Sequence, residues 1–349
     1  MTNKTYDVGE AFRVIENKLI DDIMTNLASN SAKSTDIKNF AVEEMKRLED
    51  FRLSSAGKYN GDFEEINEKV SEIIADSYNN GVSAEQRKIL KAIQKGYKTQ
   101  KVVDDVAVQS LNKAKLQALI KATTEDLRKA EHAVLRKAED DYRKIIFNAD
   151  VGLNSGALSY TEAIDMATQD FLSEGIKCIR YKNGTYRTIS DYCDMAVKTA
   201  NKKAYLAGEG AKRQEYGEHL VLVSNVGGNP CECCIPYIGE VLIDDVYSGG
   251  SQKDGDYVLL SEAMATGLFH PRCKDGTSTY FPGITDLPNR VKKSEKERIE
   301  DENEKKRYLQ NLCRQKMKYE RLYKYSLDKS NKEKYNEKIK EVDEKIKNF

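Results

Sequence analysis

Apolar residues recur at helical spacing through the first hundred residues of the chain. One stripe consists of Ala11, Val14, Ile15, Leu19, Ile20 and Ile23, and a second lies within 40–51. The polar stretches 29–36 and 78–86 predict breaks between helices of ordinary length. Ser83 is expected to cap a helix over 86–96, because its hydroxyl oxygen can satisfy an otherwise unpaired amide. Residues 1–100 are therefore predicted to form an N-terminal helical arm.

A longer helical pattern follows over 102–149, where the chain contains neither glycine nor proline. Its apolar stripe consists of Leu111, Leu116, Leu119, Ile120, Leu127, Ala130, Val134, Leu135, Ala138, Tyr142, Ile145 and Ile146. This pattern predicts one long helix, or two helices divided near Thr123 and Thr124. Because such stripes are typical of a helix bundle or a two-helix coiled coil, residues 101–175 are interpreted as a structural long-helix bundle.

The pattern becomes mixed after residue 150. A glycine-containing turn over 152–160 leads into a helix expected over 160–173. Asn183-Gly184 predicts a short hairpin, because this pair tolerates the positive φ angles of a tight turn. Ser190 is expected to cap a helix over 191–206, which Gly208 and Gly210 would interrupt or end.

Three short apolar runs then occupy 219–225, 239–243 and 256–260, separated by loops that contain glycine or proline. Runs of this length and composition predict strands, and with the preceding hairpin and helix they give an α+β module over 176–285. The expected fold class is therefore mainly α with a small α+β module, in which long helices flank a short-stranded domain bearing cysteine and histidine.

Composition agrees with a helix-rich chain and reveals a charged tail. The 349 residues include 33% charged residues, 5 prolines and no tryptophan. The 57 basic and 57 acidic residues balance, which argues against attraction of the whole molecule to nucleic acid. Over 290–349, however, 20 basic residues face 13 acidic ones. Residues 286–349 are therefore expected to form a basic tail of one or two charged helices.

The sequence contains no apolar stretch long enough to span a bilayer, and its first residues lack the layout of a signal peptide. We therefore expect the chain to be made and kept in a cytoplasm. It contains seven cysteines, of which Cys231, Cys233 and Cys234 are crowded together. In a reducing compartment this arrangement favours metal binding or free thiols over structural disulfides.

The motif most informative about chemistry combines Cys231 and Cys234 with His270 and Cys273. Two nearby thiols can bind one zinc ion from a tight turn, and the His-x-x-Cys pair supplies two further ligands. Pro271 favours an extended backbone at His270, as in a ligand presented by a loop. We therefore predict a structural zinc site, although Cys233 is a surplus thiol that leaves the choice of ligands open.

Two other interpretations of this motif remain. The cysteines could be small buried apolar residues, with His270 as a hydrogen-bonded loop anchor. Alternatively, one cysteine could be a nucleophile activated by His219 or His270. The only other histidine is His132, and no oxyanion-hole or phosphate-loop signature is present. We therefore assign no catalytic residues and expect that the chain is not an enzyme.

An ordered series of motifs over 111–283 carries a resemblance to a known family. The series comprises Asp141-Tyr142-Arg143, Leu158-Ser159-Tyr160, Gly175-Ile176, 181–184, 192–199, 219–224, the cysteine cluster, 238–241, 267–273 and 280–283. In order and spacing the chain resembles the tailed-bacteriophage minor capsid proteins of the Phage_min_cap2 type, relatives of the Mu F-like head morphogenesis proteins. The cysteine cluster and 270–273 look more like the Mu F-like variant.

The resemblance implies a structural protein of the phage head. Such proteins are present in multiple copies per particle, lie near the portal or inside the head, and support assembly, DNA packaging or ejection. The implied partners are the portal protein, the major capsid protein or both, together with packaged DNA. The implied location is the virion, after assembly in the host cytoplasm.

The basic tail suggests a possible contact with DNA or a partner protein. Its candidate residues are Lys305, Lys306, Arg307, Arg314, Lys316, Lys318, Arg321 and Lys324, interleaved with tyrosines that can stack on bases. The competing interpretation is a solvated helix packed on the portal or on other copies, which the 13 acidic residues favour. Three classes of function therefore remain open: structural virion protein, nucleic-acid-binding accessory protein, and metal- or thiol-dependent enzyme.

Overall fold

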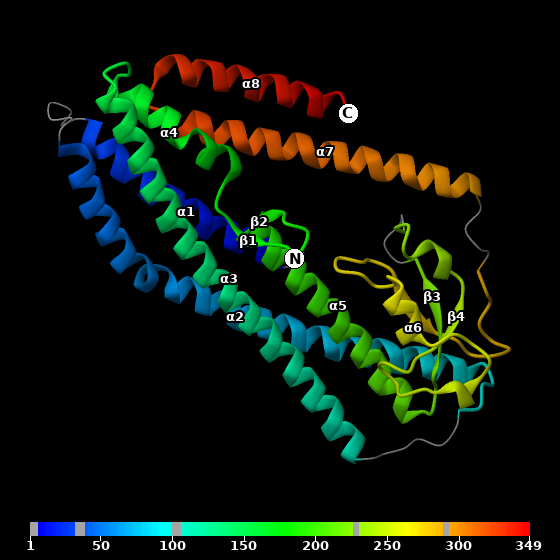
Figure 1. Ribbon diagram of the computed structural model, residues 1–349. Helices are drawn as coiled ribbons and strands as arrows, with labels where there is room; N and C mark the ends of the chain where they lie inside the picture. The colour runs from blue at the N-terminus through cyan, green and yellow to red at the C-terminus, as the bar shows by residue number, and fades with distance from the viewer. Residues whose placement is uncertain (1–5, 32–38, 100–105, 226–229, 289–292) are drawn as a thin grey trace. The chain divides into compact units, whose positions relative to one another are not determined.

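The computed structural model describes residues 6–31, 39–99, 106–225, 230–288 and 293–349 (Figure 1). The helices are α1 (Val8–Ser31), α2 (Phe40–Gln94), α3 (Val106–Asn154), α4 (Tyr160–Glu174), α5 (Ile189–Glu215), α6 (Leu260–Ala265), α7 (Lys293–Tyr325) and α8 (Lys329–Lys347). The strands are β1 (Lys177–Arg180), β2 (Tyr186–Thr188), β3 (Leu220–Ser224), β4 (Val241–Ile243) and β5 (Gly276–Thr279). Short 3₁₀ helices occupy η2 (Ile235–Tyr237) and η3 (Gln252–Asp254). The expected fold class, mainly α with a small α+β module, is confirmed.

The chain forms two compact units. Unit 1 comprises 1–66, 127–194 and 304–349, and unit 2 comprises 67–126 and 195–303. Among the described residues, no helix is both long and apolar enough to cross a bilayer. The division into four sequence segments at residues 100, 175 and 285 stays a prediction.

Unit 1 is a helical assembly whose core lies between α1 and the neighbouring helices. The rings of Phe12 and Phe63 lie 6.1 Å apart, and those of Phe51 and Tyr142 lie 5.9 Å apart edge to face. Burial of such aromatic side chains provides much of the apolar contact between helices. Within this unit α8 folds back along α7 (Figure 1), and Lys316 pairs with Asp343 at 2.6 Å. The prediction of a charged pair of helices in the tail is therefore confirmed.

The prediction of a helix break over 78–86 is wrong, because α2 continues through it. Gly81 does not end the helix but allows another helix to approach. A Cβ atom at Gly81 would lie 2.1 Å from the carbonyl oxygen of Tyr205, and one at Gly208 would lie 2.1 Å from that of Tyr78. The two glycines thus let the backbones of α2 and α5 touch within unit 2. Ser83 lies inside α2 and begins no helix.

Other helix boundaries also differ from expectation. Gly208 and Gly210 do not end α5, which runs to Glu215. Its first turn is capped by Thr188, whose hydroxyl accepts from the Asp191 amide at 3.3 Å, and not by Ser190. α3 is unbroken, because the hydroxyls of Thr123 and Thr124 bond to carbonyls of the preceding turn instead of disrupting the helix. The break expected over 29–36 lies mostly outside the described residues.

The Asn183-Gly184 hairpin is confirmed as the antiparallel pair β1–β2. Gly184 has a φ of 81° and donates to the carbonyl of Tyr181 at 2.9 Å. This arrangement is a turn closed by a residue in the left-handed region, where glycine has no Cβ penalty. The hairpin belongs to unit 1.

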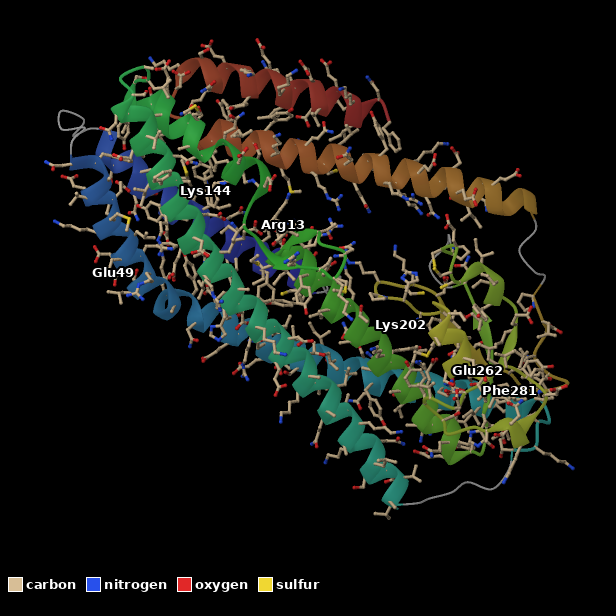
Figure 2. All side chains as sticks on the ribbon, in the orientation of Figure 1. Arg13, Glu49, Lys144, Lys202, Glu262 and Phe281 are labelled. Carbon is tan, nitrogen blue, oxygen red and sulfur yellow. The ribbon has the colours of Figure 1, made fainter. Side chains whose placement is uncertain are left out.

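The sheet of unit 2 has the antiparallel order β4–β3–β5. The strands expected over 219–225 and 239–243 are confirmed as β3 and β4. The strand expected over 256–260 is wrong: Leu259 makes one isolated bridge to Ile243, and α6 begins at Leu260. β5, with the sequence Gly-Thr-Ser-Thr, takes the second position beside β3. Figure 2 labels Phe281 just beyond β5, where its ring packs 4.9 Å from that of Tyr97.

Candidate metal centre

The first arm of the candidate metal centre is a tight turn that holds Cys231 and Cys234. The amides of Cys234 and Ile235 both donate to the Cys231 carbonyl at 3.0 Å, which brings the two thiols to one side of the turn. Cys234 is fully buried in the apolar cluster beneath the sheet, together with Val221, Leu242 and other residues. Cys231 is half-buried. The turn therefore attaches one thiol to the core and leaves the other at its edge.

The second arm presents His270 and Cys273 from the loop after α6. The Cys273 amide donates to the His270 carbonyl at 2.9 Å. Phe269 and Arg272 have φ angles of 58° and 66°, the only positive values among described non-glycine residues. Backbone of this kind persists only where the surrounding structure requires it, and it is concentrated at functional sites. The loop thus adopts a strained conformation at the positions that flank the two candidate ligands.

The four ligands predicted from the sequence converge. Cys231 Sγ lies 2.9 Å from His270 Nε2, and Cys234 Sγ lies 3.4 Å from Cys273 Sγ. Ligand atoms of Cys231, Cys234 and His270 all lie within 4.8 Å of one another, and so do those of Cys234, Cys273 and Asp275. In tetrahedral zinc sites the ligand atoms lie roughly 3.5–3.8 Å apart. The candidate ligands therefore form two overlapping groups that share Cys234, one with Cys231 and His270 and the other with Cys273 and Asp275.

The orientation of His270 suits metal binding. Its Nδ1 lies 2.8 Å from the carbonyl oxygen of Pro271, which can only accept a hydrogen bond. Nδ1 must therefore carry the ring proton, so that Nε2 keeps its lone pair toward Cys231. A backbone carbonyl that fixes the tautomer in this way is the usual outer partner of a metal-bound histidine.

Asp275 is a member of the cluster that sequence reasoning missed. It is 3% exposed, its Oδ1 has no hydrogen-bond partner within the described part of the chain, and its Oδ2 lies 4.0 Å from Cys273 Sγ. Burial raises the pKa of this carboxyl. The signal in the sequence was an acidic residue two positions after a candidate ligand, which alone is too common to identify a site.

The electrostatics of the cluster favour a thiolate at Cys273. The hydrogen bond from Cys234 lowers the pKa of Cys273, and the same bond raises the pKa of Cys234. Lys202 of α5, labelled in Figure 2, interacts electrostatically with Cys273 and Asp275. Thiolates are the form in which cysteine binds metal. Cys233, in contrast, is exposed and belongs to neither group of converging ligand atoms found among the described residues.

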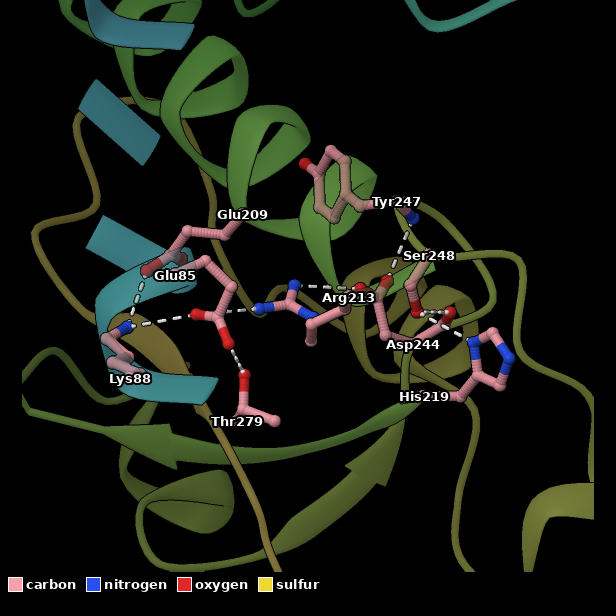
Figure 3. Close-up of polar contacts among 9 residues, drawn as sticks. All are labelled: Glu85, Lys88, Glu209, Arg213, His219, Asp244, Tyr247, Ser248 and Thr279. Atoms are coloured by element: carbon pink, nitrogen blue, oxygen red, sulfur yellow. Dashed lines mark hydrogen bonds and ion pairs between the residues drawn. The ribbon is translucent and has the colours of Figure 1, made fainter. Parts of the chain in front are cut away.

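A buried ionic network lies beside β5, the strand that follows the second arm (Figure 3). We call it the Arg213 cluster, and it consists of Arg213, Asp244, Glu85 and Thr279. Arg213 Nη2 donates to Asp244 Oδ2 at 2.9 Å, and Nη1 lies 3.7 Å from Glu85 Oε2. Glu85 also accepts from the hydroxyl of Thr279. The cluster therefore connects α5, α2, β5 and the residue that directly follows β4. Because Thr279 is in β5, it helps fix the strand that directly follows Asp275.

Comparison with known proteins gives the family. The model of the family described as Phage minor capsid protein 2 matches residues 2–349. The chain belongs to this family. No curated protein and no solved structure matches it. Minor capsid proteins are structural proteins of the phage particle, which agrees with the expectation of a virion component and of a non-enzyme.

The two histidines near unit 2 cysteines or hydroxyls differ in their partners in this minor capsid protein. His219 Nδ1 lies 3.3 Å from the hydroxyl of Ser248, so its partner is a hydroxyl and not a thiol (Figure 3). His270 Nε2 lies within hydrogen-bond reach of Cys231 Sγ, an arrangement found both in metal sites and in thiol–imidazole pairs.

The structure divides the eight tail cations into two groups. Three have partners within unit 1: Lys316 pairs with Asp343, Lys324 with Asp21, and Arg321 Nε donates to the Leu172 carbonyl at 2.9 Å. Lys305, Lys306, Arg307 and Arg314 are exposed along α7, and Lys318 is half-buried. The tail is thus partly an internal structural element, and its outer cations are the ones accessible to a partner.

Proposed function

We propose that this chain is a structural head component, associated with the portal or the inner head surface, which supports assembly, DNA packaging or ejection. We further propose that its α+β module is stabilised by one structural zinc ion bound to Cys231, Cys234, His270 and Cys273. The observation that carries the zinc proposal is the convergence of these four side chains from two separate loops. The family match supports the virion role.

Bringing these side chains together costs free energy when no ion binds them. Three thiols, an imidazole and a buried carboxylate lie close together within the described part of unit 2, and one carboxylate oxygen is buried there without a hydrogen bond. A zinc ion would accept the lone pairs of all four ligands and offset the negative charge of the thiolates. Asp275 then lies beside the ligand Cys273 as an outer partner, in the position from which carboxylates tune metal ligands.

Metal analysis tests this proposal directly. We expect the full-length protein, expressed with zinc, to contain one zinc ion per chain. Chelation should unfold unit 2 and expose it to limited proteolysis, because structural zinc contributes folding free energy, about 10–16 kcal/mol in zinc-finger peptides. The variant with Cys231→Ser and Cys234→Ser should lose the metal.

Cys233→Ser is the matched control, because Cys233 is exposed and lies between both ligands of the first arm. It should retain the zinc ion and the resistance to proteolysis. Zinc-free protein with full resistance to proteolysis would contradict the proposal. Loss of metal in Cys233→Ser but not in the double variant would overturn the choice of ligands.

Composition of purified particles tests the virion role. We expect mass spectrometry to detect the chain in intact particles, and cross-linking to connect it to the portal or major capsid protein. Detection only in infected-cell lysate, and never in particles, would overturn the assignment.

DNA binding through the outer face of α7 is a second candidate function. The exposed side chains of Lys305, Lys306 and Arg307 favour it, since cations neutralise backbone phosphates. We expect salt-sensitive retention of the full chain on duplex DNA, reduced by combined substitution of Lys305, Lys306 and Arg307 with glutamine. Retention that does not depend on salt would exclude this role.

A further inference from the structure

A cavity of about 510 Å³ lies in unit 1, lined by residues of α1, α7, the β1–β2 hairpin and the start of α5. Its volume lies within the range of small-ligand sites, about 300–1,000 Å³. The basic side chains in its wall are Arg13, Lys177, Arg187, Arg314, Arg321 and Lys324. Arg13, which lies on α1, is labelled in Figure 2. Cations from elements that are distant in sequence thus meet around one hollow.

Several of these cations are already neutralised by the protein. Lys177 pairs with Glu174 at 3.1 Å, and Lys324 pairs with Asp21 at 2.8 Å. Arg321 donates to backbone carbonyls at the end of α4 and lies close to the buried Glu16. These three residues form part of the wall and need no ligand.

Arg187 of β2 and Arg314 of α7 differ from them. Among the described residues, neither side chain makes a hydrogen bond or an ion pair, although both line the cavity. Their charges are therefore available to an anion in the cavity. The planar guanidinium group, with its fork of donors, matches the oxygen atoms of phosphate. The two arginines therefore point to a phosphate group as the missing partner.

The rest of the wall indicates what carries the phosphate. Tyr186, next to Arg187, is 49% exposed and offers a ring on which a base can stack. Glu320 adds carboxylate oxygens that can accept from the amino group of a base or the hydroxyl of a sugar. An acidic peptide fits less well, because it offers no planar base to the ring of Tyr186.

We propose that this cavity binds a nucleotide, either free or as the unpaired end of a nucleic-acid strand. Arg187 and Arg314 hold the phosphate, and Tyr186 stacks on the base. A base inside a duplex is paired and stacked on its neighbours, so that its face is not open to the tyrosine ring. The site is therefore distinct from duplex binding by the outer face of α7.

Equilibrium binding by the full-length protein tests the proposal. The two nucleotide probes are deoxythymidine monophosphate and a fluorescent 5′-phosphorylated single-stranded pentamer of deoxythymidine. Deoxythymidine and inorganic phosphate test the base and the phosphate separately. A blunt duplex and a short polyglutamate peptide represent the alternative ligands. We expect the monophosphate or the pentamer to bind more tightly than deoxythymidine or phosphate. Arg187→Gln and Arg314→Gln should each weaken this binding about tenfold, the usual loss for one charge-assisted contact. Tyr186→Leu should weaken binding of the base-bearing probes but not of phosphate.

Arg128→Gln is the matched control, because Arg128 is exposed on α3 in the same unit but does not line the cavity. It should leave nucleotide binding unchanged, and circular dichroism should show every variant folded. Binding of the monophosphate but not the pentamer assigns a free nucleotide, and the reverse assigns a strand end. Equal loss in Arg128→Gln and Arg314→Gln would overturn the cavity assignment. So would a larger loss of duplex or polyglutamate binding than of nucleotide binding in Arg187→Gln, or no binding of either nucleotide probe.

Discussion

Unit 1 buries the carboxylate of Asp165 and unit 2 buries the guanidinium group of Arg213, and the two groups are stabilised in different ways. In unit 1, Asp165 of α4 is 8% exposed and accepts four hydrogen bonds from the turn between α7 and α8 and from the first turn of α8. The donors are the Ser326 hydroxyl, the Leu327 amide at 2.7 Å, the Asp328 amide at 3.3 Å and the Asn331 side-chain amide at 2.9 Å. This carboxylate is therefore saturated by hydrogen bonds.

In unit 2, Arg213 is fully buried, and its side chain makes one hydrogen bond to the described residues, which goes to Asp244. Its Nε and Nη1 atoms have no hydrogen-bond partner among those residues. Its charge is balanced mainly by the proximity of Asp244 and Glu85, and the nearby carboxylates raise its pKa against the effect of burial.

The comparison shows that buried charges can be stabilised by hydrogen bonds or by charge balance, with different consequences when they are lost. Removal of Asp165 leaves neutral donors near the surface, which water can reach. Removal of Arg213 leaves Asp244 in the interior without the arginine it pairs with, while Glu85 keeps its ion pair with Lys88. The Cys/His centre differs from both, because side chains with metal-binding atoms lie close together there.

Arg213→Met tests the charge-balanced site and should cause the largest loss of stability. We expect a decrease of about 3–5 kcal/mol in the free energy of unfolding of unit 2, because buried Asp244 loses the arginine it pairs with, and buried Glu85 keeps Lys88 but loses Arg213. Chemical denaturation followed by circular dichroism measures it. Arg87→Met, on the exposed face of α2, should change stability by less than about 0.5 kcal/mol.

Addition of Asp244→Asn to Arg213→Met should recover part of the lost stability, since it removes one of the stranded charges. A double variant as unstable as the sum of the two single variants would mean that charge balance does not stabilise this cluster.

Asp165→Ala tests the hydrogen-bonded site. We expect a loss of about 2–3 kcal/mol, because several donors of the α7–α8 turn lose their acceptor but stay within reach of water. Hydrogen exchange should accelerate over 326–331. Asp170→Ala, an exposed position on the same helix, should leave exchange in the turn unchanged. Unchanged exchange in Asp165→Ala would show that apolar contacts alone hold the tail.

Local patterns predicted the hairpin and identified the Cys and His side chains that lie close together in the structure, because both depend on residues close together in sequence. Asn183-Gly184 defines its own turn, and each pair of candidate ligands lies within one loop. That the two loops meet could be expected only from the chemistry of zinc, which needs four ligands.

Features that depend on distant partners were not predictable in this way. Gly81 resembles a helix breaker in its own segment, and only the close approach of Tyr205 explains why a glycine belongs inside α2. Arg213 and Asp275 are of residue types that usually lie at the surface, so nothing local marked them as buried. Arg187 and Arg314 are 127 positions apart, and only the fold brings them to one cavity.

Glu16→Gln should have the smallest effect and the opposite sign. Glu16 is buried near Arg13, Asp191, Arg321 and Cys178, and burial raises its pKa to about 7 although the Ile176 amide donates to it at 3.0 Å. The folded state therefore holds a proton that the unfolded state releases above about pH 4.5, so stability contributed by this group falls as pH rises to 7.

The glutamine variant lacks this titration and keeps an oxygen that can accept from the Ile176 amide. We expect it to be more stable than the parent chain by about 1–2 kcal/mol at pH 8 and of similar stability at pH 5, measured by thermal unfolding at both values. Glu10→Gln, at an exposed position on the same helix, should show no such difference. A parent chain and glutamine variant with parallel pH profiles would mean that the charge on Glu16 is fully compensated by Arg321, which would make unit 1 as charge-balanced as unit 2.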